Sequence, residues 1–156
     1  MPIREAKLTD HAQLEALREQ GGLTRESQTA FARRLLQADV LYRVLQENSE
    51  SPPIGFYSAR FLPPEAELLE LAVANDFRRR GLGALLLRDF LAVGCKRGCR
   101  RFFLEVGVGN VAARTLYEKI GFRVCGCRPG YYRAASTGGD ALVMALELPE
   151  GETVEP

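Results

Sequence analysis

The sequence of 156 residues lacks the features that mark membrane proteins and nucleic-acid-binding proteins. No apolar run approaches the ~20 residues that a membrane-spanning helix needs. Residues 1–10 carry no apolar core of the signal-peptide kind, so we expect a cytoplasmic protein without a membrane partner. The formal net charge is +1. Because binding to nucleic acid depends on a large basic surplus, we expect no nucleic-acid partner.

Several chemically useful residue types are also scarce. Tryptophan is absent and histidine occurs once, as His11, on a helix expected at the periphery. A single peripheral histidine argues against Ser-His and Cys-His hydrolase schemes. The four cysteines, Cys95, Cys99, Cys125 and Cys127, do not show the paired C-x-x-C spacing of zinc or redox sites. We therefore expect reduced thiols and no metal site.

The most informative feature that is present is a basic, glycine-containing turn over residues 75–87. It joins an apolar strand to an apolar helix. A helix start without bulky side chains exposes its first backbone N–H groups, which together with the helix dipole attract phosphate oxygens. Gly81 and Gly83 let the main chain approach a ligand, and Arg78, Arg79 and Arg80 add positive charge. The turn therefore predicts a phosphate-binding site.

Two other phosphate-binding motifs do not fit this turn. No Gly-Lys-Ser/Thr sequence follows it, so the Walker loop is absent. The Rossmann fingerprint needs a third glycine, and Leu86 stands at that position. A basic helix start in some other α/β domain stays open as the alternative to a phosphate site.

The hydrophobic pattern predicts one domain over residues 1–148 and a short acidic tail, expected to be mobile, over 149–156. The order of the predicted elements is β-α-α-β-β-β-α-β-α-β-β. Strands are predicted over 3–6, 40–46, 54–61, 68–74, 102–106, 122–127 and 141–148. Helices are predicted from residue 9 or 10 to 21, over 24–37 with Phe31, Leu35 and Leu36 inward, after the glycine turn, and over 111–120. Such a mixed sheet combines an antiparallel meander with one parallel crossover, and its ligand site is expected where the loops after Ala74 and Val106 meet.

Two segments together resemble a known family. The sequence Arg78-Arg79-Arg80-Gly81-Leu82-Gly83 resembles the Arg/Gln-x-x-Gly-x-Gly/Ala signature of the GNAT family, the GCN5-related N-acetyltransferases. Residues 104–122, and the closing piece over 128–145, resemble the RimI branch of that family, which acetylates the N-termini of ribosomal proteins. The likeness covers roughly residues 68–148. It implies an α+β (mixed α/β) domain with the GNAT acyl-CoA N-acyltransferase fold: a mostly antiparallel sheet with one parallel crossover, flanked by about four helices.

The resemblance also implies a role for individual residues. Acetyl-CoA would be the co-substrate, with an α-amino group as acceptor. Glu105 matches the general base of the branch and Tyr117 its general acid. The residues that the resemblance and the basic turn assign to acetyl-CoA are Leu71, Ala72, Val73, Arg78, Arg79, Arg80, Gly81, Leu82, Gly83, Ala84 and Asn110.

Each of these assignments has a structural alternative. Glu105 interrupts an apolar strand, where a carboxylate is costly unless it is hydrated or paired, so it could instead form an ion pair with Arg101 or another basic side chain. Tyr117 lies on a helix beside Leu116 and Ile120, so its ring could be ordinary core packing. Asn110 could serve only as a helix N-cap.

Three further residues lie near the expected cleft. Glu70, on the strand that leads to the glycine turn, could replace or assist Glu105 as the base, although a solvent-edge residue is the favoured interpretation. Tyr131 and Tyr132 could bind the first residues of an acceptor peptide or could be aromatic packing at the sheet edge.

The sequence leaves three classes of function open. The first is an N-terminal acetyltransferase acting on a protein, with a ribosomal protein such as bS18 as a candidate acceptor. The second acetylates a small amine or a lysine. The third is a non-catalytic acyl-CoA-binding module. The bare loop at Gly107 and Gly109, and the poor match of residues 21–34, depart from the pattern of the RimI branch in the region expected to shape the acceptor groove.

Overall fold

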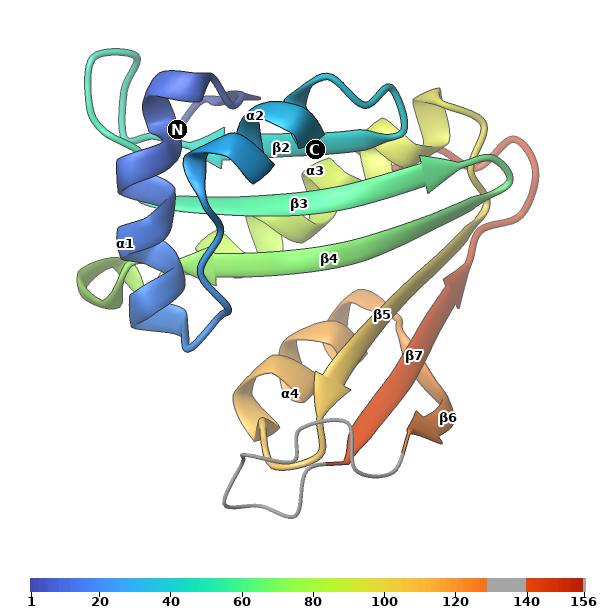
Figure 1. Cartoon of the computed structure of the whole chain (residues 1–156). Helices are drawn as coiled ribbons and strands as arrows, with labels where there is room; N and C mark the ends of the chain where they lie inside the picture. The colour runs from blue at the N-terminus through green and yellow to red at the C-terminus, as the bar shows by residue number, and fades with distance from the viewer. Residues whose placement is uncertain (129–139, 156) are drawn as a thin grey trace.

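A computed structural model describes residues 1–128 and 140–155 of the chain. Its elements follow the predicted order (Figure 1). The strands are β1 (Ile3–Glu5), β2 (Val40–Leu45), β3 (Gly55–Leu62), β4 (Glu65–Val73), β5 (Arg101–Gly107), β6 (Arg123–Arg128) and β7 (Ala141–Glu147). The helices are α1 (His11–Gly21), α2 (Gln28–Leu35), α3 (Leu82–Lys96) and α4 (Val111–Ile120), with short 3-10 turns η1 (Leu8–Asp10) and η2 (Asn75–Phe77).

The strands form one sheet in the order β1-β2-β3-β4-β5-β7-β6. All pairs are antiparallel except β4 with β5, which α3 connects. This is the predicted mixed topology with one parallel crossover. The strand predicted over 102–106 is an inner strand of the sheet, because β5 lies between β4 and β7.

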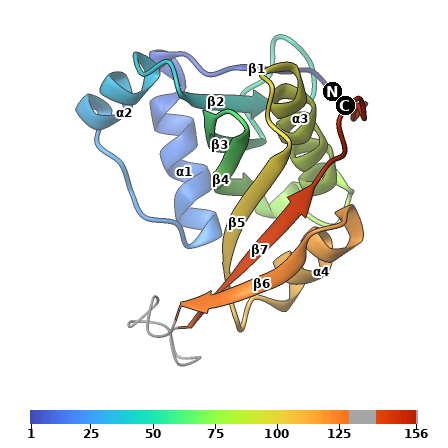
Figure 2. The same cartoon turned by 90° about the vertical axis from the view of Figure 1, so that its right-hand side faces the viewer.

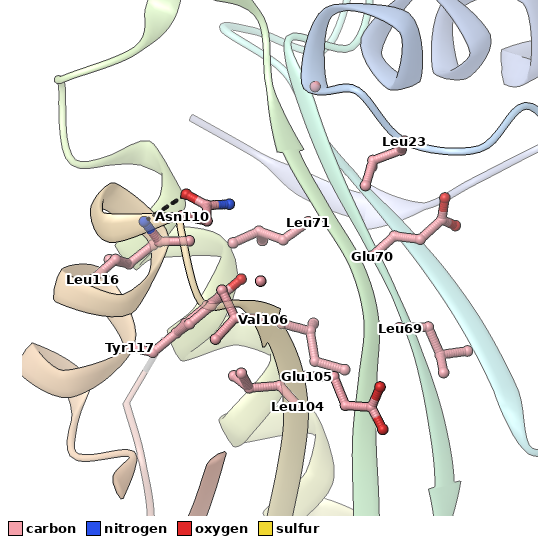
Figure 3. A pocket seen from close by; sticks show the side chains of 14 residues that line it. Leu23, Leu69, Glu70, Leu71, Leu104, Glu105, Val106, Asn110, Leu116 and Tyr117 are labelled. Atoms are coloured by element: carbon pink, nitrogen blue, oxygen red, sulfur yellow. Dashed lines mark hydrogen bonds between the residues drawn. The ribbon is translucent and has the colours of Figure 1, made fainter. Parts of the chain in front are cut away.

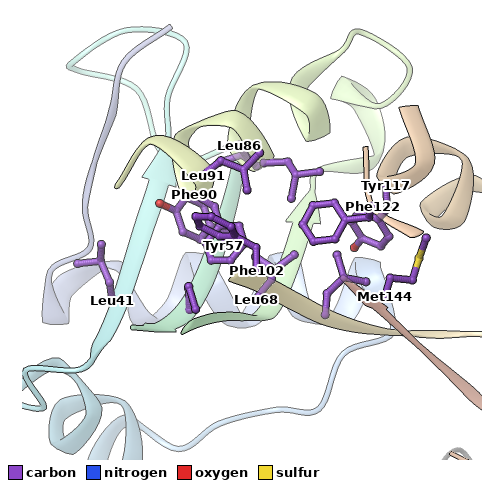
Figure 4. Packing of buried hydrophobic residues seen from close by; sticks show 14 of the residues in the cluster. Leu41, Tyr57, Leu68, Leu86, Phe90, Leu91, Phe102, Tyr117, Phe122 and Met144 are labelled. Atoms are coloured by element: carbon purple, nitrogen blue, oxygen red, sulfur yellow. The ribbon is translucent and has the colours of Figure 1, made fainter. Parts of the chain in front are cut away.

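Helices cover both faces of the sheet (Figure 2). On one face, Leu14 and Leu17 of α1 and Phe31 of α2 pack against residues of β2, β3 and β4. On the other face, a larger cluster joins α3 and α4 to the sheet (Figure 4). It includes Phe90 of α3 and Tyr117 of α4, so a single apolar layer holds these two helices to the sheet.

A bulge in β4 changes which side chains face each layer. Ser58 of β3 pairs with Glu70, but Ala59 pairs with Leu68, so Leu69 is the extra residue. Before the bulge Leu68 faces the α3 layer, whereas after it Ala72 faces α1 and Leu71 packs against the α3 side. Because side chains alternate along a strand, one inserted residue exchanges the two faces. The sequence pattern did not reveal this exchange.

Two predictions about the second helix are wrong. It was expected over 24–37 but spans only Gln28–Leu35, since Ser27 is its N-cap and accepts from the Ala30 N–H at 3.1 Å. The backbone N–H of Glu26 instead donates to the Glu15 carboxylate at 3.1 Å, which ties this segment to α1. Leu36, expected to point inward, ends the helix and is 88% exposed.

Other boundaries differ less. The strand predicted from residue 68 begins at Glu65, directly after the turn at Pro63 and Pro64. In the tail, the Arg100 guanidinium donates to the Glu152 carbonyl at 2.7 Å and Val154 packs against the larger cluster. The mobility of residues 149–156 stays a prediction. No helix among the described residues has the length and apolar character needed to cross a membrane.

A buried polar network anchors α3 to the sheet. Asp89 of α3 is 5% exposed and accepts hydrogen bonds from the Tyr57 hydroxyl at 2.7 Å and the Arg43 Nε at 2.8 Å. Burial, followed by the charge of Asp89, raises the pKa of Tyr57 above its ordinary value, so the phenol stays protonated and donates. The network fixes the helix that begins at the glycine turn.

We expect Asp89→Ala to destabilise the protein by about 3 kcal/mol or more, because it leaves the Arg43 guanidinium and the Tyr57 hydroxyl without their shared acceptor. Urea unfolding followed by circular dichroism measures this change. The matched control is Asp39→Ala, which breaks a half-exposed pair with Arg60 and should cost under about 1 kcal/mol. Equal effects of the two variants would contradict the importance of the network.

Candidate active site

The sheet opens between its two parallel strands. β4 and β5 are paired only from Glu65 with Arg101 to Glu67 with Phe103. Beyond these three pairs a pocket of about 200 Å³ lies between residues 68–71 of β4 and 104–107 of β5 (Figure 3). Past Glu67, β4 has a strand partner on the β3 side only. Its backbone groups on the β5 side can therefore bind an extended ligand, as an added strand would.

The glycine turn begins α3 beside this opening. Arg79 has φ 64° and Gly81 has φ 78°, so the turn holds two left-handed residues close together. Such a backbone turns successive N–H groups toward one side, which favours an anion. A second pocket of about 380 Å³ lies here, between the starts of α3 and α4. Its lining includes Val73, Phe77, Arg78, Arg79, Gly81, Leu82, Gly83, Ala84, Ala112, Ala113 and Leu116.

The three arginines of the turn have different surroundings. The Arg78 guanidinium donates to the Val73 carbonyl at 3.1 Å and to the Gln20 carbonyl at 3.0 Å, so it ties the turn to β4 and α1. The Arg80 guanidinium lies over the Phe77 ring, 5.1 Å from its centroid, and Arg80 is not part of the pocket lining. Arg79 lines the pocket. The phosphate-binding role of all three stays a prediction.

α3 and α4 approach each other closely at this site. A Cβ atom added to Gly83 would lie 3.0 Å from the Leu116 side chain of α4. A larger residue at position 83 would therefore push the start of α4 away from the turn. Glycine at this position allows the two helix starts to share one pocket.

Glu105 and Tyr117 reach the first pocket from opposite faces of β5. Leu104 and Val106 are buried in the α3 layer together with Tyr117, so Glu105, between them in sequence, faces the other way. Both side chains nonetheless line the pocket, because the sheet is open there. In Figure 3 the Tyr117 side chain comes from α4, while the Glu70 and Glu105 side chains extend from the two strands with their carboxylates on the side away from Tyr117.

Tyr117 is 7% exposed and its ring lies 6.2 Å from that of Phe122, so core packing is confirmed as part of its role. Arg101, the expected alternative partner of Glu105, forms ion pairs with Glu65 and Glu147. The catalytic roles of Glu105 and Tyr117 stay predictions.

This arrangement can now be compared with known proteins. Residues 8–122 match the family model of the acetyltransferase (GNAT) family. The chain belongs to the GNAT family. GNAT acetyltransferases use acetyl-CoA, so the chain is an acetyl-CoA-dependent N-acetyltransferase by family, as the resemblance implied.

Named relatives agree with the family assignment. The chain is 36% identical over 107 residues to the [ribosomal protein bS18]-alanine N-acetyltransferase of Salmonella typhimurium, covering 69% of this chain and 72% of that protein. The crystal structure of the ribosomal-protein-S18-alanine N-acetyltransferase from Escherichia coli superposes with a TM-score of 0.82 at 30% identity, covering 99% of each chain. The fold is also that of Arabidopsis thaliana NAA60 in complex with acetyl-CoA, at 19% identity, a TM-score of 0.81, and coverage of 94% of this chain and 97% of that one.

Within this GNAT domain, Glu70 is not the solvent-edge residue that the sequence favoured. The Arg18 guanidinium donates to both of its carboxylate oxygens, from Nε at 2.8 Å and from Nη2 at 3.1 Å. The Ser58 hydroxyl donates to the same carboxylate at 2.8 Å. The bulge at Leu69 is the reason, because it turns Glu70 toward α1.

Sequence reasoning missed Arg18, whose side chain is fully buried between α1 and the sheet. It also pairs with Glu15 at 2.6 Å, and its guanidinium lies 5.2 Å from the centroid of the Phe56 ring. Burial acts to lower the pKa of Arg18, but hydrogen bonds and charge interactions with Glu70 and Glu15 outweigh burial and raise it. A signal was available, since Arg18 follows Leu14 and Leu17 on the buried face of the helix.

Three other residues assigned to acetyl-CoA lie on β4 or at the start of α4. The Asn110 side chain accepts from the Ala113 N–H at 3.2 Å, which confirms the helix cap, and Asn110 also lines the first pocket. Leu71 lines that pocket, whereas the Ala72 side chain packs against α1 and leaves only its main chain for a ligand. Tyr131 and Tyr132 lie outside the described residues.

We expect Gly81→Ala to weaken the binding of coenzyme A. Alanine in the left-handed conformation costs about 1–2 kcal/mol. If the unbound turn changes conformation to avoid this cost, the dissociation constant should rise roughly 5- to 30-fold. Isothermal titration calorimetry measures the constant. Gly151→Ala is the control, because Gly151 has a similar φ of 84° and lines neither pocket. Unchanged affinity of the Gly81 variant would argue against a ligand at the turn.

Proposed function

We propose that the chain transfers the acetyl group of acetyl-CoA to the N-terminal α-amino group of a protein, with a ribosomal protein such as bS18 as the acceptor class. The observation that carries this proposal is the first pocket, at the opening between β4 and β5, because Glu105 and Tyr117 both line it. The 36% identity to the Salmonella typhimurium bS18-alanine N-acetyltransferase supports the choice of acceptor.

The two pockets together fit acetyl-CoA. Backbone N–H groups from Gly81 to Ala84 and the Arg79 side chain would hold the pyrophosphate at the positive end of α3. The unpaired edge of β4 at Leu71, Ala72 and Val73 would hydrogen-bond the amide groups of the pantetheine arm. Bound there, acetyl-CoA supplies a thioester carbon at the opening of the sheet. A main-chain N–H near Val73 would stabilise the oxyanion.

The opposite positions of Glu105 and Tyr117 suit direct transfer in a ternary complex. Glu105, directly or through one water molecule, takes a proton from the acceptor ammonium on its face of the sheet. The amine then attacks, an N–C bond forms and the C–S bond breaks. Tyr117, on the other face, gives its proton to the leaving sulfur, and the second proton lost by the nitrogen restores the phenol. A sheet without the opening would separate these two groups.

The surroundings of Glu70 support Glu105 as the main base. Three donors from Arg18 and Ser58 occupy the Glu70 carboxylate. They hold it against α1 and β3, which leaves it little freedom to turn toward an acceptor ammonium. Glu70 therefore contributes negative charge near the acceptor amine and not the proton transfer itself.

The energy of deprotonation favours an α-amine over a lysine. An α-amino group, with a pKa of about 7.8, costs roughly 1 kcal/mol to deprotonate at pH 7, whereas lysine, at about 10.4, costs nearer 5 kcal/mol. A small polyamine would need an acidic pocket, but the nearby carboxylates of Glu26 and Glu70 are each paired with arginine. The presence of Glu105 and Tyr117 in one pocket argues against a non-catalytic binding module.

We expect acetyl-CoA and the purified protein to acetylate N-terminal peptides, including the bS18 N-terminus, as detected by mass spectrometry. Polyamines, free amino acids and lysine peptides with blocked N-termini are tested in parallel. Transfer confined to the small amines or to lysine would overturn the proposal. Binding of coenzyme A without any transfer would support the non-catalytic module instead.

We expect Glu105→Gln to lower turnover roughly 10²- to 10⁴-fold with little change in the affinity for coenzyme A, because general-base catalysis is lost. Tyr117→Phe should lower turnover while the packed ring is retained. Steady-state kinetics and calorimetry measure the two effects. If Glu70→Gln abolishes turnover and Glu105→Gln does not, the assignment of the base is wrong.

A further inference from the structure

The outer strand β6 carries two of the four cysteines, one on each side of a single glycine. Cys125 and Cys127 are both exposed, whereas Cys99 is buried and Cys95 is half-buried. Within residues 1–128 and 140–155, neither exposed thiol has a hydrogen-bond partner. Two accessible thiols therefore lie close together on one strand.

The strand that holds them is an edge of the sheet and is already irregular. β6 pairs with β7 only, as Figure 2 shows. Val124 pairs with Met144, and the next pair is Gly126 with Val143. Cys125 is thus an extra residue without a partner in the ladder. A bulge of this kind bends the strand and weakens its pairing, so β6 is deformable at the cysteines.

The glycine between the cysteines is not required by the packing of the strand. A Cβ atom added to Gly126 would lie 3.8 Å from the Val143 Cβ, which is an ordinary contact. Gly126 is also not among the described glycines with a positive φ. Glycine inside a strand lowers its stability relative to alanine, because the free chain has more conformations to lose. What glycine supplies here is backbone freedom between the two thiols.

A disulfide between Cys125 and Cys127 needs this freedom. Residues two apart in an extended strand have Cα atoms about 6.6 Å apart. A disulfide joins Cα atoms roughly 4.4–6.8 Å apart and brings the Cβ atoms to about 3.8 Å. The bond therefore forms only if β6 shortens between its two cysteines, and this shortening disturbs the pairing of β6 with β7.

The strand register places this disturbance in line with the proposed base. Gly126 pairs with Val143 of β7, and Val143 pairs with Glu105 of β5. Neighbouring strands lie about 4.8 Å apart, so Gly126 is about 10 Å from Glu105 across one intervening strand. At Glu105, β5 has a strand partner on the β7 side only, because its pairing with β4 ends at Phe103. The position of Glu105 therefore depends on β7, and β7 is supported by β6.

We propose that Cys125 and Cys127 are a site of reversible oxidation, at which a low-molecular-weight disulfide converts both thiols to an intrastrand disulfide and thereby lowers acetyl transfer. The effect on transfer rests on the proposed function, because it acts through Glu105. The thiol chemistry is independent of that function.

The oxidation proceeds by two exchanges. One cysteine thiolate attacks a sulfur of the disulfide RSSR and expels RS⁻, which leaves a mixed disulfide on the protein. The second thiolate attacks the protein sulfur, forms the bond between Cys125 and Cys127 and expels the other RS⁻. Two protein thiols are oxidised, RSSR is reduced to two RSH, and the thiol protons pass to the two RS⁻ groups. Because strain makes a disulfide more reducible, excess thiol reverses the change.

Oxidised glutathione tests this site on the full-length protein. We expect Cys125 and Cys127 to lose their reactivity toward N-ethylmaleimide together, and dithiothreitol to restore it. Trypsin cleaves after Arg123 and keeps both cysteines in one peptide, which mass spectrometry should find lighter by two hydrogen atoms.

The rate of acetyl transfer is measured on the same samples. It should fall about tenfold or more on oxidation, because a displacement of about 1 Å near the chemistry can cost about 10²-fold. Initial rates are needed, since the coenzyme A that is released is itself a thiol and reduces the bond.

Matched variants assign the effect to this pair. The double variant Cys125→Ser, Cys127→Ser should keep its rate after treatment with oxidised glutathione. Cys95→Ser is the control and should lose its rate as the parent protein does, because Cys95 lies on α3. Gly126→Ala should be fully active when reduced and should form the disulfide less readily, because alanine restricts the bend. Thermal unfolding checks that each variant is folded.

The outcomes separate the two proposals. Mixed disulfides with glutathione at both cysteines, without a bond between them, overturn the oxidation site. A Cys125–Cys127 disulfide that leaves the rate of an active protein unchanged also overturns it. If the reduced protein acetylates no peptide, the proposed function fails by itself, and hydrogen exchange then tests the site. Faster exchange of the β7 amides in the oxidised protein supports the inference, and unchanged exchange overturns it.

Discussion

The separation of β4 from β5 after only three residue pairs is the constraint on which the site depends. A fully paired sheet would have satisfied the backbone of both strands and left no space between them. The large apolar layer keeps the sheet together despite the opening, because α3 and α4 bridge it on one face. The close approach of Gly83 to Leu116 joins the two helices at the same place. The protein therefore exposes strand edges inside its sheet without losing the integrity of its core.

The opening also lets side chains from opposite faces of the sheet line one pocket, as the proposed reaction requires. Glu105 belongs to the face covered by α1 and α2, and Tyr117 to the face covered by α3 and α4. The proposed base and the proposed acid therefore have different surroundings. The Tyr117 phenol lies in an apolar layer, whereas the other face carries the charged network around Arg18.

The bulge at Leu69 links this charged network to the reaction site. Because the bulge exchanges the two faces of β4, the Glu70 carboxylate accepts hydrogen bonds from Arg18 and Ser58, while Leu71 lines the first pocket. Arg18 in turn ties α1 to the strand beside the opening. The segment between α1 and α2 is held by the same network, through the Glu26 N–H and Glu15. One group of buried charges thus fixes both the path of β4 beside the first pocket and the position of the segment between α1 and α2.

Local sequence was sufficient for much of this molecule. The order of elements, the parallel crossover and the N-cap at Asn110 follow from periodicity and from residues with strong local preferences. The glycine turn could be located because its arginines and glycines stand between an apolar strand and an apolar helix. The family resemblance over residues 68–148 agrees with the family match and with the fold.

Tertiary structure alone decided the rest. The inserted Leu69, the partners of Glu70, the burial of Arg18 and the short α2 all depend on contacts between residues far apart in the chain. A strand pattern cannot show a bulge, because the extra residue is defined only by the partner strand. Nor can a helix pattern show which arginine is buried, since that depends on the carboxylates that the fold brings to it. Sequence thus determined the order of the elements and the position of the glycine turn, and long-range packing determined which charged side chains pair.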